Sequence, residues 1–224
     1  PIKSSAASDV YKRQTSCCPA WSVMAKKLFP EHAKCISMAL TPMTLTARLI
    51  KQHNPDARVV FIGPCAAKKL EAMRRSVRSE VDFVLTFEEM TGIFSAKHVD
   101  LENIEEDPAG VSDASTDGRN FAVAGGVAQA VVNVIKRDHP DQEIKVANAE
   151  GLKECRQLLK LATLGKYPGY LLEGMACPGG CVAGAGTMQA IKKSQTSVGL
   201  YAKQSTHKTS SETEYIKELD KLVD

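Results

Sequence analysis

Seven cysteines constrain this chain more than any other feature of its sequence, because five of them lie in three short segments marked by proline or glycine. The segments are Cys17-Cys18-Pro19, Pro64-Cys65 and Cys177-Pro178-Gly179-Gly180-Cys181. An odd number of cysteines in 224 residues, with no visible secretory signal, is atypical of the small secreted scaffolds that disulfides stabilise. We therefore expect a reducing, cytoplasmic setting in which the clustered cysteines form a metal or redox site.

The two remaining cysteines, Cys35 and Cys155, lie in helix-like stretches without such turn residues. Free cysteine is among the most often buried residue types, so we expect both to be small residues of the core. The five histidines show no spacing typical of metal ligands. The five clustered cysteines are therefore the candidate ligands.

The overall composition excludes several other classes of protein. Hydrophobic residues make up 43% and charged residues 25% of the chain, which is typical of globular proteins. No run approaches 18 consecutive apolar residues, so we expect no membrane insertion. The net charge of +3 and the aromatic content of 5% are too low for a nucleic-acid-binding surface, and we expect no nucleic-acid partner.

Hydrophobic periodicity predicts strands that alternate with helices along the chain. We expect strands at residues 58–63, 81–87, 143–149 and 170–175, and helices at 21–28, 42–50, 66–75, 126–135, 151–164, 184–193 and 213–223, with a short helix starting near residue 88. This alternation is typical of parallel α/β architecture. We predict an α/β fold with two lobes of mainly parallel sheet flanked by helices, and a metal cluster held between the lobes.

Changes in composition divide the chain into four predicted segments. Residues 1–14 are rich in serine and alanine and weakly periodic, and we interpret them as a non-native leader. Residues 15–105 would form the first lobe and carry the first two cysteine segments. The acidic, turn-rich residues 106–120 would form an exposed connection, and residues 121–224 the second lobe with the third cysteine segment and a C-terminal helix.

Two of the clustered cysteines, Cys65 and Cys177, each follow a predicted strand, at the end where ligands bind in open α/β sheets. Cys181 and one of the adjacent Cys17 and Cys18 would complete a set of four thiolates. Four thiolates suit zinc or a 4Fe-4S cluster, and the lack of two close pairs favours the cluster. Adjacent side chains diverge, so the other member of the Cys17–Cys18 pair would be a spare thiol that relays protons if its environment lowers its pKa.

Three segments resemble the signature motifs of the FeFe-hydrogenases, also called iron-only hydrogenases. They are Thr15-Ser16-Cys17-Cys18-Pro19-Ala20-Trp21, then Gly63-Pro64-Cys65-Ala66-Ala67-Lys68-Lys69-Leu70-Glu71, then Glu173-Gly174-Met175-Ala176-Cys177-Pro178-Gly179-Gly180-Cys181-Val182-Ala183-Gly184-Ala185-Gly186. These motifs occur in the family's order over residues 15–186, about three-quarters of the chain, and the match is highly specific. The chain resembles the C-terminal H-cluster domain of the large subunit.

The resemblance implies a cofactor and its ligands. The 4Fe-4S cubane of the H-cluster would be held by Cys18, Cys65, Cys177 and Cys181. Cys181 would also bridge to a diiron subcluster that carries CO, CN and a bridging dithiolate.

The resemblance also implies catalytic roles for four further residues. Cys17 would pass protons to the bridging dithiolate, and Lys68 would donate hydrogen bonds to a cyanide on the distal iron. Met175 would line the pocket, and Ser37 aligns by its spacing with a serine of the family's proton path. Glu71 completes the second motif, either within the site or as a surface ion-pair partner.

The implied activity is the reversible reduction of protons to H₂, with electrons from ferredoxin or a fused ferredoxin-like module and a cofactor supplied by hydrogenase maturation proteins. Gly63 stands where the catalytic members have methionine, and Ala185 interrupts a triple glycine, as in the sensory-type branch of the family. We expect Gly63 to leave space near the diiron unit and to lower turnover. The alternatives are a hydrogen-sensing homologue linked to a signalling domain, and a plain 4Fe-4S protein of assembly or electron transfer.

Overall fold

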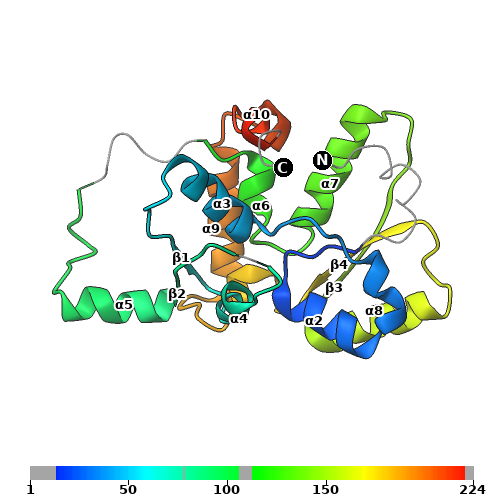
Figure 1. The fold of residues 1–224 in the computed structure, drawn as a ribbon, viewed down its shortest axis with the longest axis horizontal. Coiled ribbons are helices and arrows are strands. Elements are labelled where there is room, and N and C mark those ends of the chain that lie inside the picture. Colours follow the sequence, from blue (N-terminus) through cyan, green and yellow to red (C-terminus); the bar gives the residue numbers. More distant parts are fainter. Residues whose placement is uncertain (1–13, 78, 106–112, 220–224) are drawn as a thin grey trace.

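The computed structural model describes residues 14–77, 79–105 and 113–219, and Figure 1 shows how they are arranged. The α-helices are α2 (Pro19–Leu28), α3 (Pro42–His53), α4 (Ala67–Met73), α5 (Phe87–Ala96), α6 (Thr116–Asn120), α7 (Gly126–Asp138), α8 (Leu152–Thr163), α9 (Ile191–Lys203) and α10 (Ile216–Leu219). Short 3₁₀ helices span Pro30–Cys35, Cys181–Ala183 and Ser210–Glu212. Most of these helices match the periodicity of the sequence.

Two parallel strand pairs form the β-structure. Strand β1 (Val60–Gly63) pairs with β2 (Phe83–Thr86), and β3 (Lys145–Glu150) pairs with β4 (Tyr170–Met175). Figure 1 shows the first pair in the left half of the view and the second pair in the right half. The predicted α/β class with parallel strands is confirmed.

The segment before α2 extends the second sheet. Gln14 lies in a parallel bridge with Leu172 of β4 on one side and with Ile36 on the other. The N–H of Thr15 donates to the carbonyl of Leu172 at 3.1 Å. Gln14 is 1% exposed, so the predicted leader is wrong at its last residue, which belongs to the fold. Residues 1–13 lie outside the described residues.

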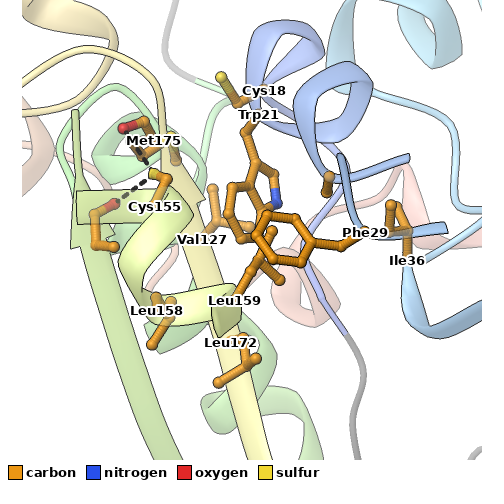
Figure 2. Packing of buried hydrophobic residues seen from close by; sticks show 12 residues of the cluster. Cys18, Trp21, Phe29, Ile36, Val127, Cys155, Leu158, Leu159, Leu172 and Met175 are labelled. Carbon is orange, nitrogen blue, oxygen red and sulfur yellow. Dashed lines mark hydrogen bonds between the residues drawn. The ribbon is translucent and has the colours of Figure 1, made fainter. Parts of the chain in front are cut away.

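The main hydrophobic core lies where α2 and α8 pack against this extended sheet. Its buried members are Cys18, Trp21, Ala25, Phe29, Ile36, Val127, Ala149, Cys155, Leu158, Leu159, Leu172 and Met175. Figure 2 shows Trp21 at its centre, and the indole Nε1 of Trp21 donates to the carbonyl of Thr15 at 3.0 Å. Residues 18–36 thus pack on the sheet assigned by sequence to the other lobe. The lobe boundaries stay a prediction, and the core does not follow them.

The two cysteines predicted to lie in the core differ in burial. Cys155 is fully buried, and its Sγ donates to the carbonyls of Ala149 and Met175, both at 3.5 Å, as Figure 2 shows. Cys35 is only partly buried, because it ends the 3₁₀ helix where the chain turns into the bridge with Gln14. The core prediction is therefore confirmed for Cys155 and wrong for Cys35.

Strand β1 is less buried than its sequence predicts. Val60 and Ile62 are 45% and 44% exposed, because in the described residues β1 has β2 as its only strand neighbour. A fully buried strand requires sheet neighbours and helices over both faces. The prediction of a buried strand at residues 58–63 is wrong in this respect.

Residues 184–193 form a loop up to Ala190, and α9 begins only at Ile191, so the helix predicted from residue 184 is wrong. The reason is packing. A Cβ on Gly184 would overlap the carbonyl of Pro64, and one on Gly186 would overlap the side chain of Thr86. The N–H of Gly186 donates to the Pro64 carbonyl at 2.9 Å. This loop is thereby held against the turn that carries Cys65.

The predicted acidic connection also differs at its C-terminal end. Residues 106–112 lie outside the described residues, but residues 116–120 form α6, capped by the buried side chain of Ser115. Hydrogen bonds from Thr116 to the carbonyls of Ala202 and His207 hold α6 beside the end of α9. The predicted C-terminal helix is present as α10, while residues 220–224 lie outside the described part of the chain.

Among residues 14–77, 79–105 and 113–219, every helix is too short or too polar to cross a bilayer.

Gly174 lies against the face of Trp21, and a Cβ at this position would overlap the indole ring. We expect Gly174→Ala to lower the free energy of unfolding by about 3 kcal/mol, because overpacking forces a buried aromatic ring to move. The control is Gly199→Ala, since nothing lies within 4 Å of a Cβ there and alanine favours the helix α9. Urea unfolding measures both variants, and equal midpoints for the two would contradict this packing.

Candidate metal centre

One cavity is lined by all five clustered cysteines. Its lining residues are Cys17, Cys18, Pro19, Cys65, Lys68, Met175, Ala176, Cys177, Gly180, Cys181 and Gly184. They come from three segments that are far apart in the sequence, as the three cysteine motifs predict. Lys68 and Met175 also lie here, whereas Ser37 does not line the cavity. The Ser37 side chain accepts a hydrogen bond from the N–H of Ala39 at 3.2 Å instead.

The first two cysteine segments lie at helix starts. Cys18 is the residue before α2, whose first position is Pro19, and its Sγ accepts a hydrogen bond from the N–H of Ala176 at 3.5 Å. This bond joins the first segment to the third. Cys65 follows β1, and its carbonyl accepts from the N–H of Lys68 at 3.3 Å in the turn that begins α4. Both thiols are thus placed by backbone elements rather than by free loops.

The third segment follows β4 and approaches a neighbouring loop closely. Gly179 and Gly180 have φ values of +91° and +94°, which favour glycine. A Cβ on Gly180 would lie 2.5 Å from the N–H nitrogen of Ala124. The carbonyl of Gly179 accepts from Ala124 at 3.2 Å, and the carboxylate of Glu150 accepts from the N–H of Gly179 at 2.7 Å. Sequence reasoning missed Glu150, which fixes the loop between Cys177 and Cys181.

The thiols influence one another electrostatically. Burial, together with the neighbouring Cys18 and Cys65, raises the pKa of Cys181 from 9.0 to about 11. Burial, Cys18 and Cys65 also raise the pKa of Cys177. Thiolates in this cavity would therefore repel each other, and a bound cationic metal centre relieves such repulsion.

The chemistry of the donor set fits an iron-sulfur cluster. In the described part of the chain, no group of three His, Cys, Asp or Glu side chains is placed to hold one metal ion. The thiols of Cys18, Cys65, Cys177 and Cys181 line one cavity. A cubane takes one thiolate at each iron corner, whereas zinc needs four thiolates about one atom. The donor set therefore fits a cubane.

Cys17 lies in the same cavity, and its surroundings raise its pKa. Burial, together with the neighbouring Cys18, Cys181 and Glu173, raises its pKa from 9.0 to about 12. Lys68 lowers it, but by less. The condition stated for a proton relay, a lowered pKa, is therefore not met, because a buried thiol among other acidic groups resists ionisation. The thiol keeps its proton.

Lys68 reaches the cavity as half of a buried ion pair. Its Nζ lies 2.6 Å from Oε2 of Glu71 and donates to the carbonyl of Cys17 at 3.2 Å. Glu71 is 5% exposed, so it belongs to the interior and is not a surface partner. Glu71 orients the ammonium group and supplies the charge that permits its burial.

The sequence of residues 6–185 matches the profile of a family described as the iron only hydrogenase large subunit, C-terminal domain. The chain belongs to this family. The match begins inside the stretch predicted to be a leader.

The curated relatives of this hydrogenase-family chain include hydrogenases and iron-sulfur assembly proteins. The periplasmic Fe hydrogenase large subunit of Nitratidesulfovibrio vulgaris is 29% identical over 215 residues, which cover 77% of this chain and 50% of that protein. Iron hydrogenase 1 of Clostridium pasteurianum is 27% identical over 213 residues, covering 77% and 37%. Cytosolic iron-sulfur assembly component 3 of Pongo abelii is 27% identical over 225 residues, covering 78% and 46%. The chain spans half or less of each relative.

A solved FeFe-hydrogenase structure from Chlamydomonas reinhardtii superposes with a TM-score of 0.75 at 20% identity, covering 96% of this chain and 73% of that one. A second solved structure, of HydA(deltaEFG), which reveals stepwise assembly of the FeFe-hydrogenase H-cluster, superposes with a TM-score of 0.74 at 21% identity, covering 97% of this chain and 74% of that one. These likenesses establish the hydrogenase fold of the chain.

The space expected beside Gly63 in this hydrogenase-family chain is taken by an aromatic ring. A Cβ on Gly63 would lie 2.8 Å from Cε1 of Phe61, two residues earlier on the same face of β1. The ring therefore covers the position where a side chain at residue 63 would begin. The expectation of open space at this glycine is wrong.

Breaking the buried ion pair of Lys68 and Glu71 should lower the free energy of unfolding far more than breaking the exposed pair of Lys69 and Glu89. We expect Glu71→Ala to lower the free energy of unfolding by about 3 kcal/mol, because it leaves a buried ammonium group without its countercharge. Lys69→Ala breaks the exposed pair and should cost less than about 1 kcal/mol. Urea unfolding of both variants checks this, and similar losses would show that the first pair is solvated.

Proposed function

We propose that this chain is the H-cluster domain of an iron-only hydrogenase and catalyses the reversible reduction of protons to H₂. The observation that carries the proposal is the shared cavity, which combines four candidate cluster thiols with a fifth thiol and a buried ammonium group. A plain cubane needs neither of these last two groups. Their presence supports a cofactor that carries anionic ligands and exchanges protons.

The proposed cofactor is a 4Fe-4S cubane linked to a diiron subcluster with CO, CN and a bridging dithiolate. Cys18, Cys65, Cys177 and Cys181 would hold the cubane, and Cys181 would also bridge to the diiron unit. When bound, the H-cluster supplies the iron centre at which protons, electrons and H₂ interconvert.

Three side chains of this chain would serve the chemistry. Cys17 holds a proton on its Sγ at the wall of the cavity, within reach of a group bound there. Lys68 presents its Nζ to an anionic ligand, while Glu71 fixes the direction of the ammonium group at 2.6 Å. Met175, 2% exposed, closes one wall and excludes water.

A second candidate function is that of a plain 4Fe-4S protein in iron-sulfur assembly. The observation that favours it is the similarity to an assembly component, at 27% identity over 78% of this chain. A hydrogen sensor would use the same cofactor and differ in its partner. The diiron unit separates the assembly function from the other two.

The proposed partners follow from the proposed reaction. Electrons would come from ferredoxin or a fused ferredoxin-like module, hydrogenase maturation proteins would insert the diiron unit, and a sensor would act through a signalling domain. We place the protein in the reducing cytoplasm, a proposal supported by the free thiols of all seven cysteines.

Reconstitution with iron and sulfide, followed by a synthetic diiron precursor, tests the proposal. We expect infrared bands of bound CO and CN, together with H₂ production from a reduced electron carrier. Cys17→Ala should keep these bands and reduce turnover by about 100-fold or more, because it removes the proton-holding thiol. Cys35→Ala is the matched control, since Cys35 lies away from the cavity and should change neither signal.

Each of the other outcomes would support a different function or a different ligand assignment. Absence of CO and CN bands in a chain that holds a cubane would support the assembly function. Bands without H₂ turnover in the wild-type chain would support the sensor. Loss of the bands in Cys17→Ala would mean that Cys17, and not Cys18, is the cluster ligand.

A further inference from the structure

The peptide group between Met175 and Ala176 is hydrogen-bonded at both ends, and one end contacts a candidate cluster ligand. Its N–H donates to Sγ of Cys18 at 3.5 Å. Its carbonyl accepts from the N–H of Gly151 at 2.8 Å and from Sγ of Cys155 at 3.5 Å. The peptide bond is trans, so the carbonyl and the N–H point in opposite directions. This one peptide group therefore connects the metal-centre cavity to the core behind it.

The surroundings of the Cys155 thiol make it a hydrogen-bond donor. The residue is 0% exposed, and its Sγ lies 3.5 Å from the carbonyl oxygens of both Ala149 and Met175. Figure 2 shows Cys155 directed from α8 toward these two carbonyls. A carbonyl oxygen can only accept, so the thiol keeps its hydrogen and shares it between the ends of β3 and β4.

The start of α8 holds both donors to the Met175 carbonyl in one helical turn. The N–H of Cys155 donates to the carbonyl of Gly151 at 2.9 Å, and the N–H of Gly151 itself donates to Met175. The thiol of Cys155 is therefore fixed by the same turn that positions the Gly151 N–H. Cys155 does not line the metal-centre cavity, so it is not placed as a further cluster ligand.

These bonds form a chain in which each donor affects the next. Hydrogen bonds in series polarise one another, so donation to the Met175 carbonyl makes the N–H of Ala176 a stronger donor to Cys18. An N–H group that donates to a cluster thiolate stabilises the more negative, reduced form of the cluster. Hydrogen bonds to the sulfurs are among the features that set the reduction potentials of such clusters.

We propose that Cys155 is a positioning residue that raises the reduction potential of the cubane through the peptide group between Met175 and Ala176. This inference rests on the proposed function, in which Cys18 is a ligand of the cubane. One electron passes to the cubane from the external electron carrier, and no covalent bond forms or breaks. Cys155 acts by donating its hydrogen bond and takes part in no bond to iron.

The first test measures the reduction potential of the chain reconstituted with iron and sulfide alone, by redox titration with electron paramagnetic resonance. Cys155→Ala removes the donor and should lower the equilibrium constant for reduction about threefold. For a one-electron couple this corresponds to a potential about 30 mV lower. Cys155→Ser keeps a donor, and a hydroxyl donates more strongly than a thiol, so its potential should equal or exceed that of the wild type. Cys35→Ala is the control and should leave the potential unchanged, because Cys35 lies away from the cavity.

The second test follows the amide proton of Ala176 by nuclear magnetic resonance in the full chain without metal. Cys155→Ala should move this resonance upfield, because the N–H of Ala176 then donates more weakly to Cys18. Cys155→Ser and Cys35→Ala should leave it near its wild-type position or, for the serine variant, move it downfield.

An unchanged potential in Cys155→Ala would overturn the proposal. An equal fall of the potential in Cys155→Ala and Cys155→Ser would overturn it too, since the thiol would then act only by filling space. A wild-type chain that forms no cubane would refute the proposed function instead. The Ala176 resonance would in that case still decide whether Cys155 acts on this amide, and an unmoved resonance in Cys155→Ala would refute the hydrogen-bond chain.

Discussion

The close approach of three backbone segments is the constraint on which the rest of the structure depends. Gly174 lies against Trp21, Gly180 against Ala124, and Gly184 against the carbonyl of Pro64, and none of these contacts leaves room for a Cβ. Each contact joins a segment bearing one cysteine motif to another part of the chain. The glycines thereby allow thiols more than 150 residues apart in sequence, such as Cys18 and Cys177, to line one cavity.

Thiolates placed this close together in a buried cavity repel one another, and a bound cationic metal centre would relieve that repulsion. Burial and mutual repulsion raise the pKa values of Cys17, Cys177 and Cys181. The four candidate ligands line one cavity, and four thiolates suit the four iron corners of a cubane. The second charge in the site, Lys68, is paired with Glu71, and both side chains are buried.

The sequence predicted much of this arrangement, because its strongest signals are local. The strand before Cys65, the strand before Cys177 and the proline after Cys18 each indicate where a thiol must point, and the structure places all three at one cavity. What could not be predicted depends on long-range packing. The burial of Gln14, the pairing of Lys68 with Glu71 and the ring of Phe61 over Gly63 appear only when distant segments meet.

The central claim is that four thiols from three segments hold one cubane, and the iron and acid-labile sulfide content after anaerobic reconstitution tests it most directly. The account predicts about four irons and four sulfides per chain. It also predicts a loss of most of this iron in each of Cys18→Ser, Cys65→Ser, Cys177→Ser and Cys181→Ser, with full loading kept in Cys17→Ser and Cys35→Ser. A chain that binds a single zinc ion, or that keeps its full iron content when any of the four proposed ligands is replaced, would contradict the account.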